Sequence, residues 1–165
     1  MRLKSITGFA LLAASPLAAH PEGAHAPTVQ AKPAHISDEA AVRSVLSQYK
    51  EAIEKLDARG TERLFAADSA IFETGGVEGN YANYLAHHLT PELGEFKSFR
   101  YSNYKIEIRF VGPVALATES YAYRIETKKG EIAERLGVAT SVLTKIGGHW
   151  KILSMHNSAR RPKAS

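Results

Sequence analysis

The sequence from Leu64 to Leu89 reads LFAADSAIFETGGVEGNYANYLAHHL. Its first half is a short apolar run, typical of a strand, that ends in the carboxylate of Glu73 before a Gly-Gly turn. A helix is predicted from about Asn80, and its candidate functional side chains are Tyr81, Tyr84, His87 and His88. Such polar groups beside apolar ones are what a hydrophobic pocket with a few polar contacts requires.

The two adjacent histidines are expected to differ in their environment. Successive residues of a helix point about 100° apart, so only one of the two can face inward. His88 follows Tyr84 by four residues and Tyr81 by seven, which places the three on one face of the helix. His88 is therefore the inward candidate, and His87 is predicted to be exposed.

Helical patterns come before this stretch and strand patterns after it. Apolar residues recur at helical spacing between Ser37, a favoured N-cap, and Gly60, and Thr61 begins a shorter helix. Pro91 is expected to limit the third helix. Four long runs joined by tight turns then favour an antiparallel meander, so the fold class is α+β. The expected strands are Phe99–Phe110, Val114–Thr127, Ile132–Ile146 and His149–Ser158.

The ends of the chain differ from its centre in composition. Residues 1–19 combine a positive start with a short apolar run, which is typical of a signal peptide and predicts a periplasmic or secreted product. Residues 20–35, rich in Ala, Pro and His, are interpreted as a disordered linker. The folded domain is expected to span 36–158, followed by a basic tail at 159–165. The chain has no cysteine, so neither disulfides nor thiolates contribute to it.

The net charge of +4 is concentrated outside the expected domain. Residues 36–158 hold 15 basic and 16 acidic side chains, a net charge of −1. Nucleic-acid binding needs a clustered basic face, so this near-neutral composition argues against it. The N-terminal apolar run is too short to span a bilayer, and no stable membrane insertion is expected.

Two segments of the chain match a known pattern. They are VLSQYKEAIEKLDARGTERLFAADSAIFE (Val45–Glu73) and GGHWKILSMHNS (Gly147–Ser158). With the order of the elements, they resemble the nuclear transport factor 2-like superfamily, which includes SnoaL-like domains and ketosteroid isomerases. The resemblance implies three N-terminal helices packed in the concave face of a strongly curved, mainly antiparallel sheet, a cone-shaped α+β barrel with a pocket. This scaffold serves enzymes, binders and assembly subunits alike.

The resemblance also implies roles for single residues. Tyr49 falls where ketosteroid isomerases have a tyrosine that donates to the substrate oxyanion, and Glu73 falls where they have the general base. Together these groups would remove a proton next to a carbonyl and stabilise the enolate. The family's second oxyanion donor is replaced by Ser141 or Val142. Losing one such donor costs about 10²–10³ in rate, which argues against efficient steroid isomerisation.

Further candidates come from the helix after the turn and from the last strands. His88 is expected to assist Glu73 and Tyr49 in catalysis, and the pocket is expected to include Tyr84, Tyr81, His156, Ser141 and Trp150. Simple alternation puts His156 on one strand face with Trp150 and Ile152, and Leu153 with Met155 on the other. Tyr49 is equally compatible with a core tyrosine, and each histidine with a structural, hydrogen-bonded residue.

A metal site is only weakly indicated. Its candidate ligands, Glu73, His88 and His156, come from distant segments without diagnostic spacing. We therefore expect no metal and no cofactor.

Three functions remain open at this point. The first is an exported pocket protein that binds a small, partly apolar organic ligand, with or without acid–base catalysis. The second is an isomerase, cyclase or dehydratase that uses Glu73 and Tyr49. The third is a non-catalytic dimerisation module. Apolar residues on both faces of the last strand predict a homodimer through the sheet.

Overall fold

The computed structural model describes residues 33–163, with side chains from Ser37 onward. The expected signal peptide and most of the expected linker lie outside the described residues, and export stays a prediction. The helical elements are α1 (Pro33–Glu54), η1 (Thr61–Leu64), α2 (Tyr81–Tyr84), η2 (Leu85–Leu89) and α3 (Thr90–Glu95). The strands are β1 (Phe65–Glu73), β2 (Gly76–Gly79), β3 (Phe96–Val111), β4 (Val114–Thr127), β5 (Ile132–Ile146) and β6 (His149–Arg160).

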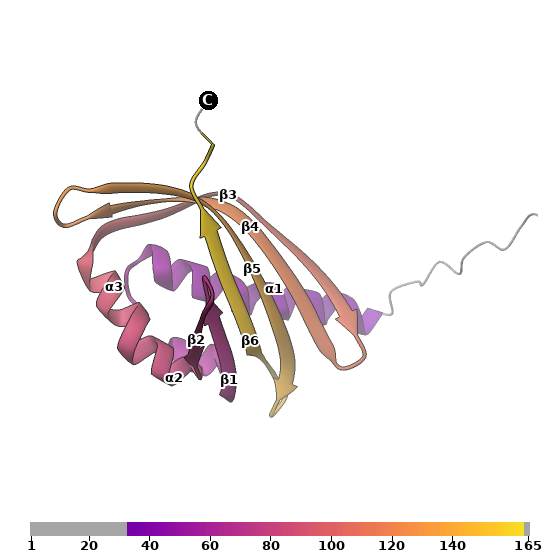
Figure 1. The fold of residues 1–165 in the computed structure, drawn as a ribbon. Helices are drawn as coiled ribbons and strands as arrows, with labels where there is room; N and C mark the ends of the chain where they lie inside the picture. The colour runs from indigo at the N-terminus through magenta and orange to yellow at the C-terminus, as the bar shows by residue number, and fades with distance from the viewer. Residues whose placement is uncertain (1–32, 164–165) are drawn as a thin grey trace, which may run out of the picture. The chain divides into compact units, whose positions relative to one another are not determined.

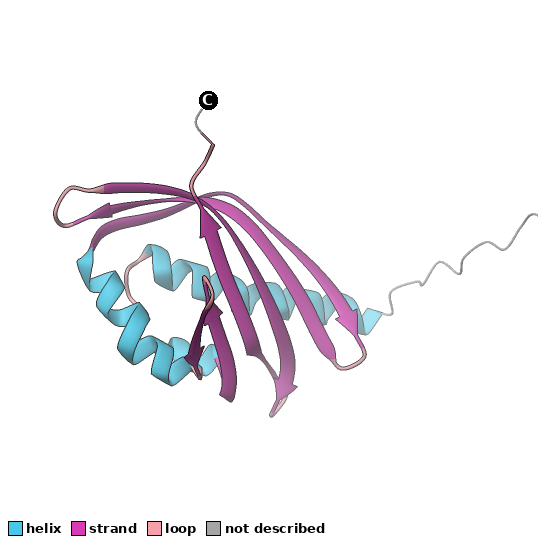
Figure 2. Ribbon diagram, viewed as in Figure 1, coloured by secondary structure: helices cyan, strands magenta, loops and turns pink. Residues whose placement is uncertain are grey.

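The strands form one curved, six-stranded sheet in the order β2-β1-β6-β5-β4-β3. Strands β3 to β6 form the expected antiparallel meander, and β1 pairs in parallel with β6. Figure 1 shows α1 lying along the concave side of the sheet, with α2 and α3 at one end of it. The predicted α+β class is confirmed, and β4 and β5 have the predicted bounds. Figure 2 shows the helices in cyan and the strands in magenta from the same side.

The predicted limits of two helical segments were wrong. Helix α1 begins at Pro33 rather than at Ser37, because proline suits the first turn of a helix, where its missing N–H has no partner to lose. The third helical segment also runs past Pro91 to Glu95. A π-helical turn from Leu85 to Leu89 precedes the proline, and its wider hydrogen-bond spacing relieves the usual conflict inside a helix.

The core lies between α1 and the concave face of the sheet. Val42 and Leu46 of α1 are almost fully buried, as are Ile71 of β1, Leu143 of β5 and Ile152 of β6. Each such side chain contributes about 1.5–3 kcal/mol relative to full exposure. This core holds α1 against the sheet. A cavity remains beside the C-terminal half of α1. Within residues 33–163, no helix is both long and apolar enough to cross a membrane.

A bulge in β6 changes which side chains face inward. Val142 pairs with Ser154 and Leu143 with Ile152, so the pairing skips Leu153. One extra residue reverses the alternation from that point on. Trp150, Ile152 and Met155 are therefore all buried, and His156 is exposed. The predicted division of this strand into one face with Trp150 and His156 and another with Met155 was wrong for this reason.

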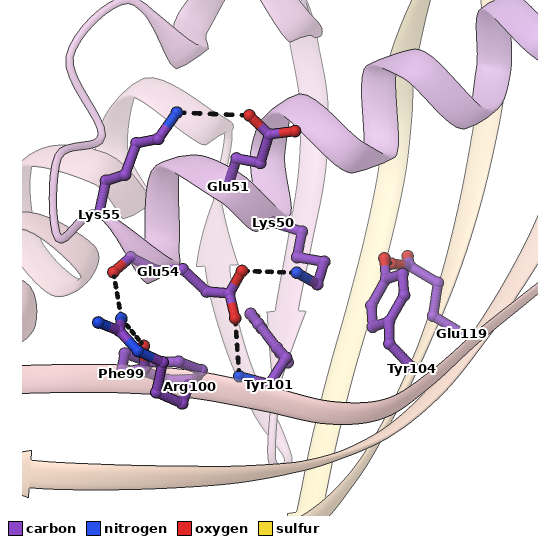
Figure 3. Close-up of polar contacts among 9 residues, drawn as sticks. All are labelled: Lys50, Glu51, Glu54, Lys55, Phe99, Arg100, Tyr101, Tyr104 and Glu119. Carbon is purple, nitrogen blue, oxygen red and sulfur yellow. Dashed lines mark hydrogen bonds and ion pairs between the residues drawn. The ribbon is translucent and has the colours of Figure 1, made fainter.

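A second bulge, in β3, has a similar effect. Ser102 pairs with Ala122 and Lys105 with Ser120, so that Asn103 and Tyr104 together oppose Tyr121 alone. Asn103 has a left-handed backbone, with φ 53°, which asparagine tolerates better than most residues. The shift turns Tyr104 to the same side of the sheet as Tyr101 (Figure 3).

Candidate functional site

A cavity of about 190 Å³ lies between the inner face of the sheet and the helices. For scale, an engineered apolar cavity of about 150 Å³ binds benzene. The aromatic side chains that line it are Tyr49, Tyr84, Phe96, Phe99, Tyr101, Tyr104, Tyr121 and Tyr123. Its charged residues are Lys50, Glu73, Glu92 and Glu119. The cavity therefore fits a substituted aromatic ring and offers polar contacts at a few points on an aromatic wall.

Glu73 occupies the end of β1, on the same inner face as Ile71. The Tyr84 hydroxyl donates to Glu73 Oε2 at 2.6 Å, which fixes the carboxylate at the cavity wall. Burial and the adjacent Glu73 carboxylate raise the pKa of Tyr84, so the hydroxyl keeps its proton and remains a donor.

His88 lies behind Glu73 and is not part of the cavity wall. Its Nε2 is 4.0 Å from Glu73 Oε2 and 3.6 Å from Glu92 Oε1, and its Nδ1 is 3.2 Å from Glu78 Oε2. Burial alone would lower the pKa of His88, but the three surrounding carboxylates raise it above its usual value. The protonated imidazolium can thus balance the negative charge at this end of the cavity. His87 is exposed.

Tyr49 of α1 lines the cavity and packs edge-on against Phe65 and Tyr81. None of the hydrogen bonds among the described residues uses its hydroxyl. Burial raises the pKa of Tyr49 well above its ordinary value, and nearby tyrosines add to the effect. A neutral phenol at this position can donate to a ligand.

Four predicted pocket residues do not line this cavity. The Tyr81 hydroxyl bonds with Thr61 at 2.7 Å within the core, and the Trp150 indole donates to Asp38 at 3.1 Å. Ser141 is buried, and its hydroxyl has no hydrogen-bond partner among the described residues. His156 points to the outer face because of the β6 bulge and contacts Phe72. Among residues 33–163, no three His, Asp or Glu side chains are placed to hold a metal ion.

The sequence prediction missed two further carboxyl groups of the cavity, Glu92 of α3 and Glu119 of β4. Glu119 is the more deeply buried of the two. Glu119 is 8% exposed, and it accepts a hydrogen bond from the Tyr104 hydroxyl. Burial raises the pKa of Glu119, although the bond from Tyr104 opposes the shift. The signal was present: Glu119 alternates with Ala117, Tyr121 and Tyr123 on a face that is otherwise apolar or aromatic, where a carboxylate is unusual.

Lys50 borders the same region but is already engaged (Figure 3). Its ammonium is 2.6 Å from Glu54 Oε2 and lies 5.3 Å and 5.4 Å from the ring centres of Tyr101 and Tyr104. Glu54 is held in turn by the Tyr101 backbone N–H at 3.0 Å. Lys50 therefore closes this side of the cavity as an ion pair over aromatic rings.

In this chain a curved sheet encloses the helices and a cavity, and a carboxylate lies at the cavity wall. This arrangement defines the nuclear transport factor 2-like class of α+β proteins. More closely, residues 42–162 match the SnoaL-like domain family, and the chain belongs to this family. Among curated proteins, no sequence matches this chain.

Solved structures agree on the fold. A nuclear transport factor 2-like superfamily protein from Salmonella enterica serovar Typhimurium is 18% identical, with a TM-score of 0.67 over 81% of this chain and 96% of that one. A proposed ketosteroid isomerase from Shewanella frigidimarina is 27% identical, with a TM-score of 0.61 over 72% and 94%. A proposed scytalone dehydratase from Novosphingobium aromaticivorans is 16% identical, with a TM-score of 0.66 over 76% and 86%.

Proposed function

We propose that the protein binds a small, partly apolar organic molecule, about the size of a substituted aromatic ring, in the cavity, with Glu73 as the polar anchor. The observation that carries this proposal is the Glu73 carboxylate held by Tyr84 at 2.6 Å on a cavity wall that is otherwise largely aromatic. The Tyr84 hydroxyl uses only part of the acceptor capacity of this carboxylate, and a ligand hydroxyl would be a suitable further donor.

Isothermal titration of the full chain with phenol and with benzene tests this proposal. Phenol should bind more tightly than benzene, because its hydroxyl can donate to Glu73. Glu73→Gln should reduce that difference, since a hydrogen bond to a charged group is worth about 1.5–3 kcal/mol. Glu107→Gln, on an exposed position of β3, serves as the matched control and should change nothing. Equal binding of phenol by the wild type and by Glu73→Gln would contradict the proposal.

Acid–base catalysis is the second candidate. The groups around Glu73 favour it. The Glu73 carboxylate lies at the cavity wall, His88 Nε2 is 4.0 Å from its Oε2, and the Tyr49 phenol of α1 lines the same cavity. Glu73 would remove a proton next to a carbonyl, and Tyr49 would donate to the enolate oxygen. The names of the isomerase and dehydratase relatives are consistent with this chemistry.

Proton NMR in D₂O separates turnover from binding. The full chain should accelerate deuterium exchange at the methyl group of acetophenone, and Glu73→Gln should abolish that acceleration. Tyr49→Phe should slow exchange more than it weakens binding, because its donation is strongest to the enolate. Binding without any accelerated exchange would leave the protein as a carrier.

We also propose that two copies associate through the outer face of the sheet. Val138 and Leu136 of β5 are exposed there, at 51% and 37%. Light scattering of the full chain at micromolar concentration should give about twice the monomer mass, and Val138→Glu should reduce it. A wild-type monomer across that range would contradict this proposal.

A further inference from the structure

Building on the proposed function, we infer that Glu119 and Tyr104 form a second polar subsite in the cavity. This subsite binds a carbonyl or hydroxyl oxygen of the ligand. The ligand class is then narrowed from any small aromatic molecule to one with oxygen functions at two positions, one facing Glu73 and the other facing Glu119.

The two carboxyl groups lie in one row across the sheet. Glu73 pairs with Asn157 of β6, Asn157 pairs with Ala139 of β5, and Ala139 pairs with Glu119 of β4. All four residues line the cavity, so the row faces inward along its whole length. Three strand spacings separate its ends, about 14 Å along the sheet. Both side chains enter the same cavity, whose volume is about 190 Å³, so one small molecule can contact the two carboxyl groups.

The middle of the row leaves room for a ligand. Ala139 is small and almost fully buried, with 4% exposure, and it lies in the row between Asn157 and Glu119. Its methyl group takes up little of the cavity, and a larger side chain at this position would fill part of the cavity. The aromatic rings of Tyr101, Tyr104 and Tyr121 surround the Glu119 end. A ligand ring that bridges the two carboxyl groups would thus contact these aromatic side chains.

Glu119 differs from Glu73 in its electrostatic surroundings. No cation forms an ion pair with it among the described residues, and the nearby Lys50 is paired with Glu54. The hydroxyl of Tyr104 donates to it, which leaves the rest of the carboxyl group able to bond with a ligand. Burial without a countercharge favours the neutral acid. A neutral carboxyl group donates its proton to an oxygen acceptor, while Glu73, supported by His88, accepts from a donor.

Three related probes test the inference on the full chain: phenol, acetophenone and 4-hydroxyacetophenone. Isothermal titration should show 4-hydroxyacetophenone binding about tenfold more tightly than phenol, which is the effect of one additional well-placed hydrogen bond. Glu119→Ala should remove that advantage, whereas Glu107→Gln, on an exposed position of β3, should keep it in full. Glu119→Gln should keep most of the advantage, because an amide is also uncharged and can donate.

Each outcome has one meaning. An advantage that survives Glu119→Ala would overturn the second subsite while leaving the binding function intact. If Glu119→Gln bound 4-hydroxyacetophenone markedly more tightly than the wild type does, the assignment of Glu119 as a neutral hydrogen-bond donor would be overturned. Failure of all three probes to bind would overturn the proposed function and this inference with it. Ala139→Leu provides an independent arm: it keeps both carboxyl groups and should abolish binding of 4-hydroxyacetophenone.

Discussion

Gly137→Ala should destabilise the protein because the added methyl group would displace the ring of Tyr121. Gly137 of β5 lies opposite Tyr121 of β4, and a Cβ atom at this position would be 2.2 Å from Tyr121 Cε2 and 3.0 Å from Cζ. Carbon atoms pack best at about 3.5–4.0 Å, so the ring must move by roughly 1.3 Å or more. Overpacking of this kind costs about 1–3 kcal/mol. For a domain of about 130 residues, this corresponds to a fall in Tm of roughly 4–11 °C.

The displaced ring should also disturb the cavity. Tyr121 stacks on Tyr104 with ring centres 5.8 Å apart and meets Tyr101 edge-on at 4.9 Å, so it cannot move without shifting its neighbours. We therefore expect weaker binding of 4-hydroxyacetophenone together with the lower Tm. Thermal unfolding followed by circular dichroism, and titration of the same samples, measure the two effects.

Two comparisons separate this mechanism from a general effect of adding a methyl group. At Gly94 of α3, an added Cβ atom would meet nothing within 4 Å beyond its own helix backbone, and φ is not left-handed. Gly94→Ala should therefore stabilise the helix by about 0.5–1 kcal/mol. In a Tyr121→Ala background, Gly137→Ala should cost almost nothing, because the obstructing ring is gone. An equal cost of Gly137→Ala with and without the Tyr121 ring would refute the reasoning.

Three other predictions concern polar groups and backbone. Tyr84→Phe should lower the unfolding free energy by about 1.5–3 kcal/mol by removing the donor to Glu73, and urea unfolding at constant m-value checks it. The raised pKa of Glu119 means that its contribution to stability is present at low pH and lost as pH rises through the folded-state pKa. The Tm of Glu119→Gln should therefore rise relative to that of the wild type as the pH increases from the ordinary carboxyl pKa through the raised folded-state pKa of Glu119, unlike that of Glu107→Gln, and parallel curves would contradict this. Asn103→Val should cost about 1–2 kcal/mol at its left-handed backbone, whereas Asn103→Gly should be nearly neutral in the same unfolding assay.

The sequence allowed the fold class and the limits of β4 and β5 to be predicted because these depend on local patterns. Alternation over long runs and glycine turns at Gly130 and Gly147 define β4 and β5 without reference to the rest of the chain. The position of Glu73 at the end of a strand was predictable for the same reason. The start of α1 was not, because Ser37 has a strong capping preference that Pro33, four residues earlier, overrides in the folded chain.

Site residues were predicted less well because a bulge in β6 reverses the alternation from which His156 was placed, and a second bulge, in β3, turns Tyr104 inward. Leu153 moves His156 to the outer face and brings Met155 and Asn157 to the cavity. A bulge is set by pairing with a neighbouring strand, and nothing in the local pattern of β6 indicates it.

The same property of strands explains how the cavity acquires its second polar end. In a regular strand with Asn103 paired, alternation from Tyr101 would place Asn103 on the inner side and Tyr104 on the solvent side, and Glu119 would be buried without its donor. An unpaired buried carboxyl group is costly, so the bulge and the carboxyl group depend on each other. The bulge in β6 acts in the same direction, since it aligns Asn157 with Glu73 and Ala139 in the inward row. The two single-residue bulges thus give the inner face of the sheet a row of cavity-lining residues with a carboxyl group at each end, Glu73 and Glu119.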